Sequence, residues 1–256
     1  MRVPLGIAGS VLVLVTLWQT VLRPLHWPPL AMVGRYFVES VGSSDTYRAV
    51  LMTGIRALIA VAIGYTLAMV LAIATGRSFI GWCAFFFLLL TLQKIPAIAM
   101  IDVLVKSRLG IGLAMTTTLA STVVLTFTWL VLHHRAATLD MREVFALRVA
   151  GFRRWQVPLY GLLPHLGAAI GGAARLAMSI ALVMVILGEW RGVWADNSLW
   201  QYGIGVEISR SIDSYDAQAR ILASCLWLGA LGIVLDLLVQ GVFNSISRFV
   251  GVRFDR

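Results

Sequence analysis

Long uncharged runs are the feature that most restricts how this chain can fold. Runs of this kind are Val3–Leu22 and Leu109–Leu132, which contain no charged residue, and the largely apolar stretches 49–75, 79–105, 167–188 and 221–243. A helix needs about 20 largely apolar residues to cross a bilayer, inside which every backbone polar group must be paired. The runs therefore predict an all-α integral membrane protein with about six transmembrane helices.

The charge content agrees with this interpretation. Only 13% of the residues are charged, whereas soluble domains carry about 25%. The net charge of +9 would favour a nucleic-acid partner in a soluble protein, but here the basic residues lie mostly between the apolar runs. With a cytoplasmic N-terminus, about ten basic residues lie inside and six outside, as the positive-inside rule expects. We therefore expect a multi-pass protein of the bacterial inner (cytoplasmic) membrane that binds no nucleic acid.

The sequence divides into three parts. Residues 1–46 form an N-terminal anchor span and an external segment, residues 47–250 a core of five spans, and residues 251–256 a cytoplasmic tail. Arg2 followed by an apolar stretch is similar to a signal peptide, but the apolar stretch is longer than a usual signal core and no small-residue cleavage site follows it. We expect this first span to be retained as an anchor.

The most polar internal segment is the loop at residues 134–165, between the fourth and fifth spans. Thr138 and Asp140 are residue types that cap a short helix. Gly151 is placed to end it, because helices commonly end at a left-handed glycine. A short helix that is joined rigidly to two spans acts as a lever. The loop therefore predicts a cytoplasmic coupling helix between spans 4 and 5.

Several motifs together resemble one transporter family. The pattern Gly151-x3-Trp155-Gln156-x7-Pro164 resembles the second half of the EAA loop of binding-protein-dependent ABC transporter permeases, with the nitrate/sulfonate/taurine-like branch the most similar. Further similar motifs follow the family's order: Thr53-x2-Arg56, Lys94-Ile95-Pro96-Ala97, Gly110-Ile111-Gly112, Arg175, Glu189 and Gly203-Ile204-Gly205. The resemblance covers roughly residues 47–249.

The resemblance implies a permease subunit of an ABC importer that works by ATP-driven alternating access. Its implied partners are ATP-binding cassette ATPase subunits, which hold ATP and Mg, an external solute-binding protein and a second permease chain. It also implies an EAA-like surface that contacts the ATPase. That surface would comprise Phe145, Ala146, Leu147, Arg148, Gly151, Arg153, Arg154, Trp155 and Pro164.

The loop departs from the family's pattern at one important position. Phe145 aligns with the family's glutamate, and Glu143 lies two residues earlier, about 200° around a helix. Because this loop is atypical, a heterodimer in which a second permease carries the regular loop is an alternative to a homodimer.

Ionisable groups inside apolar runs are candidates for function, because they are costly to place in a membrane. Arg56 and Lys94 are the candidates for a cationic path that serves a small, anionic solute. Glu189 is a candidate for bracing the outer loop or for contacting the solute. Similar groups, for some of which snorkelling to the interface is an alternative explanation, are Asp102, Arg175 and Asp236.

No catalytic, cofactor or metal site is predicted for this chain. Its only lysines, Lys94 and Lys106, are not preceded by glycine, so the G-x4-G-K-[ST] phosphate-binding loop is absent. His133 and His134 are adjacent and therefore cannot share a helical face as metal ligands do. ATP hydrolysis is thus expected on a partner subunit. The alternative, an ion-gradient-driven secondary transporter, would explain the membrane charges but not the loop that ends at Pro164.

Overall fold

The computed structural model describes residues 13, 15–22, 27–75, 79–94, 113–138, 141–153, 156–157, 163–191 and 202–250. Every regular element within these residues is a helix, which confirms the predicted all-α class. The elements are η1 (Trp18–Leu22), α2 (Leu30–Val41), α3 (Ser44–Thr75), α4 (Phe79–Lys94), α6 (Leu113–Ala137), α7 (Met141–Val149), α8 (Leu163–Arg191), α9 (Ile204–Ser211) and α10 (Ala217–Val250).

Four helices, α3, α6, α8 and α10, are long and apolar enough to cross a membrane, and α4 is a shorter apolar helix. Most of the predicted first span, Val3–Leu22, lies outside the described residues, as does the proline-containing part of the third span after Lys94. Among the described residues, four helices are therefore candidates for crossing a membrane, and a total of six stays a prediction.

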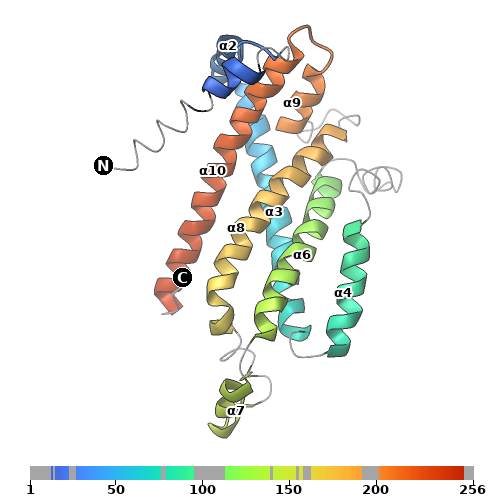
Figure 1. Ribbon diagram of the computed structural model, residues 1–256, viewed down its shortest axis with the longest axis vertical. Helices are drawn as coiled ribbons and strands as arrows, with labels where there is room; N and C mark the ends of the chain where they lie inside the picture. Colours follow the sequence, from blue (N-terminus) through green and yellow to red (C-terminus); the bar gives the residue numbers. More distant parts are fainter. Residues whose placement is uncertain are drawn as a thin grey trace.

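The long helices run side by side along the long axis of the molecule (Figure 1). Helix α3 packs against both α6 and α8, and α8 also packs against α10. The short helices α2 and α9 lie together at one end, and α7 lies at the opposite end (Figure 1). We refer to these as the α9 end and the α7 end.

Several helices extend beyond the apolar runs from which they were predicted. Helix α3 begins at Ser44 rather than near Ala49, and α6 continues past Leu132. Hydropathy marks the apolar part of a span, whereas a backbone helix continues until a cap or turn ends it. Pro164 consequently lies in the first turn of α8 rather than before it, where a missing N–H costs no intrahelical hydrogen bond.

A stripe of small residues on α3 allows neighbouring helices to approach closely. The stripe comprises Ala57, Ala60, Gly64, Ala68 and Ala72, all of which are buried. A Cβ atom at Gly64 would lie 2.5 Å from the backbone oxygen of Ser121 in α6. Small residues of this kind let helix backbones pack tightly in membranes, where the hydrophobic effect does not drive helix association. The α3–α6 contact therefore depends on the absence of a side chain at Gly64.

Gly64→Ala should destabilise the protein by about 1–3 kcal/mol, the usual cost of overpacking a close contact. The matched control is Gly34→Ala in α2, where an added Cβ meets no atom within 4 Å. Thermal unfolding in detergent measures both variants. A Gly64→Ala protein that is as stable as Gly34→Ala would contradict the close α3–α6 packing.

Candidate functional site

Helix α7 is attached to the long helices by apolar side chains on one of its faces. Val144 is buried and belongs to the same core cluster as Leu132 of α6 and Leu166 of α8. Leu147 and Phe152 pack against that cluster as well. Movement of α7 would therefore be transmitted directly to α6 and α8.

The end of α7 is a Schellman motif. The N–H of Phe152 donates to the carbonyl of Leu147 (3.1 Å), and the N–H of Gly151 donates to that of Arg148 (3.0 Å). Gly151 has a φ of 86°, a left-handed conformation that favours glycine. The predicted short helix ending at Gly151 is thus present, and its end is fixed by two backbone hydrogen bonds.

The opposite face of α7 carries exposed apolar side chains. Phe145 is 70% exposed and Val149, one turn later, is 74% exposed. Ala146 and Arg148 are also exposed. Phe145 and Leu147, which were both expected on the EAA-like surface, therefore separate: Phe145 lies on the surface and Leu147 packs on the chain's own core.

The other predicted loop residues are only partly described. Arg153 is exposed, and its backbone N–H donates to the side-chain oxygen of Gln156. Arg154 and Trp155 lie outside the described residues, and only the backbone of Pro164 is described. The contact of these residues with an ATPase stays a prediction.

Near the α9 end, a buried ion pair joins α3 to α8. The Arg56 guanidinium donates to a Glu189 carboxylate oxygen at 2.5 Å, and each side chain is only 1% exposed. The Thr53 hydroxyl lies 2.9 Å from both carboxylate oxygens and donates to them. Arg56 also donates to the carbonyl of Tyr202 at 2.8 Å. The two opposite charges, which lie 133 residues apart in sequence, thus satisfy one another inside the bundle.

The start of α9 is bound by the same carboxylate. The N–H of Gly205 donates to Glu189, and the N–H of Ile204 donates to the Thr53 hydroxyl, both at 3.0 Å. A Cβ atom at Gly203 would lie 2.5 Å from the Glu189 carboxyl carbon, and one at Gly205 would lie 2.5 Å from a backbone oxygen of α8. These contacts explain why glycines stand at both positions. We call Thr53, Arg56, Glu189 and the 202–205 backbone the α9-end clamp.

Two of the three predicted solute-path residues, Arg56 and Glu189, belong to the clamp. Arg56 is enclosed and neutralised by Glu189, an arrangement that does not favour contact with a solute. Glu189 accepts a hydrogen bond from the N–H of Gly205 at the start of α9, and its role in bracing an outer loop stays a prediction. Lys94 is the last described residue of α4, and its side chain is not described. A solute-path role for Arg56, Lys94 and Glu189 stays a prediction.

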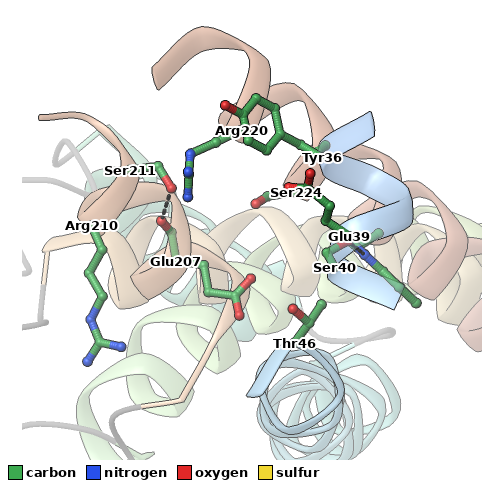
Figure 2. Close-up of a pocket in the computed structure, with 11 residues that line it drawn as sticks. Tyr36, Glu39, Ser40, Thr46, Glu207, Arg210, Ser211, Arg220 and Ser224 are labelled. Atoms are coloured by element: carbon green, nitrogen blue, oxygen red, sulfur yellow. Dashed lines mark hydrogen bonds between the residues drawn. The ribbon is translucent and has the colours of Figure 1, made fainter. Parts of the chain in front are cut away.

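A cavity of about 300 Å³ opens at the α9 end, between α2, α9 and the first turns of α10. Figure 2 shows Glu207 of α9 directed toward the residues of α2 and α3, whereas Arg210 extends away from them. The Arg220 guanidinium lies over the Tyr36 ring, 4.7 Å from its centroid. Burial raises the pKa of Glu207, and the nearby Arg210 opposes this effect.

Comparisons with known proteins identify the fold. No protein-family model and no curated protein sequence matches this chain. Its structure is similar to a chain in the crystal structure of a bacterial ABC transporter involved in the import of the acidic polysaccharide alginate. The two share 14% sequence identity and a TM-score of 0.66, over 96% of this chain and 97% of that one. The chain therefore has the fold of an ABC transporter chain over nearly its full length.

Glu189→Gln should destabilise the protein by about 3–5 kcal/mol, because it leaves the buried Arg56 charge without a counter-charge. Glu39→Gln is the matched control, since Glu39 pairs with Arg35 on an exposed face of α2 and exposed pairs contribute little. Thermal unfolding in detergent measures both. Equal stability of the two variants would show that the clamp is not a stabilising unit.

Glu207→Gln should stabilise the protein at pH 7 and have no effect below about pH 4. A raised pKa means that the folded state favours the protonated carboxyl, so stability is lost as the pH rises above the ordinary pKa of 4.5. Glutamine cannot ionise and therefore avoids that loss. Unfolding temperatures measured from pH 4 to pH 8 test this, and a constant difference across the range would refute it.

Proposed function

We propose that this chain is the transmembrane permease subunit of an ABC importer for a small, anionic solute. The motifs around Gly151 and the fold likeness to an ABC transporter chain support this proposal. In this proposal the chain belongs to the binding-protein-dependent permeases, in their nitrate/sulfonate/taurine-like branch. It crosses the bacterial inner membrane with its N-terminus and the α7 end in the cytoplasm.

The observation that carries the proposal is the two-sided character of α7. One face of α7 is held against the core of the long helices by Val144. The opposite face exposes Phe145 and Val149 on the surface of the molecule. An exposed apolar pair on a rigidly attached helix is suited to insertion into a groove of another protein. In our proposal that protein is an ATP-binding cassette ATPase, which binds ATP and Mg and pushes on α7.

The proposed transport cycle uses the rigidity of the helices that α7 contacts. ATP binding closes the two ATPase subunits, which moves α7 together with α6 and α8. The spans then change from inward-open to outward-open, and an external solute-binding protein releases its solute at the α9 end. A second permease chain completes the path. The energy reaches this chain mechanically, so it needs no nucleotide site of its own.

Phe145→Ala should reduce association with the ATPase about tenfold, as truncation of a central interface side chain does, without changing the folding of the permease. The side chain is 70% exposed, so its removal takes away a contact with the partner rather than one within the chain. Val38→Ala in α2 is the control, because Val38 has the same exposure at the other end of the molecule. Co-purification of the tagged chain from its own membranes, followed by immunoblotting for the ATPase, measures the effect.

Two outcomes would contradict the proposal. Solute uptake at the full rate in vesicles that contain this chain and an ion gradient but no ATPase would indicate a secondary transporter instead. Unchanged ATPase binding by both Phe145→Ala and a Phe145→Ala/Val149→Ala variant would show that this face of α7 is not the docking surface.

A further inference from the structure

A second ion pair joins two membrane-crossing helices, and unlike the clamp it lies on the surface. Arg175 of α8 donates through Nε and Nη2 to the two carboxylate oxygens of Asp236 of α10, both at 2.7 Å. The side chains are 53% and 36% exposed. The sequence marked both residues as candidates at membrane depth, and Arg175 also as part of the family resemblance, but it did not pair them.

The pair lies deep within the apolar part of both helices. Each residue is within five positions of the middle of its span, Ala169–Trp190 or Ala217–Ser245, which is about 8 Å at about 1.5 Å per residue. The hydrocarbon core extends about 15 Å to either side of its midplane. Neither side chain is near a span end, so snorkelling to the interface does not explain the pair.

Lipid is an unfavourable neighbour for this pair. Ionisable side chains at such depth face the protein interior or a water-filled cavity, because hydrocarbon cannot solvate them. The surroundings within this chain agree with a hydrated surface. Along α10, polar side chains follow Asp236 at one-turn intervals toward the α7 end, at Gln240 and Asn244. On α8, Ser179 is exposed one turn from Arg175, and a Cβ at Gly172 would meet open space.

The geometry of the pair also defines what it would bind. Arginine has five N–H donors, and the pairing with Asp236 uses two of them, through Nε and Nη2. Within the described part of the chain, Nη1 makes no hydrogen bond, so one edge of the guanidinium remains available. That edge matches two oxygens of a carboxylate, sulfonate, phosphate or nitrate group. Asp236 offsets the charge, which suits weak binding along a path where a solute must also leave.

We infer that the Arg175–Asp236 face of α8 and α10 lines the water-filled solute path and forms an oxyanion-binding subsite there. The inference rests on the proposed transport function and names the cation that the solute meets. In this assignment the solute contacts Arg175, and Arg56 belongs to the α9-end clamp.

Thiol labelling of the assembled complex in native membranes tests whether the Arg175–Asp236 face is exposed to water. Cys83 and Cys225 are first replaced by alanine, and Gln240→Cys or Ser179→Cys is then introduced. The probes are small methanethiosulfonates with a negative sulfonate or a positive trimethylammonium group, which react with a thiolate in water. Ile63→Cys is the control for Ser179→Cys, because Ile63 is an exposed apolar residue on α3 that also lies within four positions of the middle of its span. We expect labelling at residues 240 and 179 and none at residue 63.

Charge dependence tests the oxyanion subsite. Asp236→Asn leaves Arg175 without its counter-charge. The anionic probe should then react with the introduced thiol about fivefold faster, and the cationic probe about fivefold slower. This magnitude follows from Coulomb's law for unit charges about 8 Å apart at an effective dielectric constant of about 40. Arg175→Gln/Asp236→Asn should abolish this preference. Co-purification of the complex verifies that each variant assembles.

The outcomes separate this inference from the proposed function. Absence of labelling at residues 179 and 240 in a complex that retains its ATPase would refute a water-filled path at this face and leave the transporter assignment unchanged. Labelling that is unaffected by Asp236→Asn would overturn the oxyanion subsite. Labelling with the expected charge preference, in a chain that binds no ATPase, would support the subsite and refute the ATP-driven function.

Discussion

The α9-end clamp is the interaction on which the arrangement of the helices most depends. Two full charges lie at the end of the bundle with almost no exposure, and neither is tolerable there without the other. One carboxylate accepts hydrogen bonds from α3, through Thr53 and Arg56, and from the start of α9. Because Glu189 itself belongs to α8, three elements are fixed by a single side chain. The α9 end is thereby a rigid point from which the long helices extend.

Apolar packing holds the described part of the α7 end, whereas a buried ion pair forms the clamp. Helix α7 is attached through apolar packing of Val144, and apolar packing allows small sliding movements that a buried ion pair resists. Between the two ends, the small-residue stripe of α3 brings α3 and α6 into close contact. Tightly packed helices behave as bistable units rather than deforming gradually. In the proposed transport cycle, a push on α7 would therefore tilt whole helices about the α9 end.

The sequence predicted those parts of the fold that follow from local chemistry. Apolar runs located α3, α6, α8 and α10, and a glycine in a polar loop located the end of α7. It did not predict α9, because that helix is short and lies outside the apolar runs. Nor did it pair Arg56 with Glu189. Both had been singled out by membrane depth and by the family motifs, neither of which pairs them. The antiparallel order of α3 and α8 brings these distant residues to the same level.

Burial, rather than residue type, decides what the two arginine–carboxylate pairs can do. Arg56 and Arg175 each stand in a membrane-crossing helix and each bind a carboxylate of another helix. Arg56 is enclosed and also donates to a backbone carbonyl. A solute could therefore reach Arg56 only if its contacts with Glu189 and with that carbonyl were broken. Arg175 keeps an exposed edge while its position is held by two short hydrogen bonds. In the proposed solute path, an anion would need a preorganised donor that is open to water at mid-membrane depth. Of the two pairs, the Arg175–Asp236 pair is the one whose side chains are exposed.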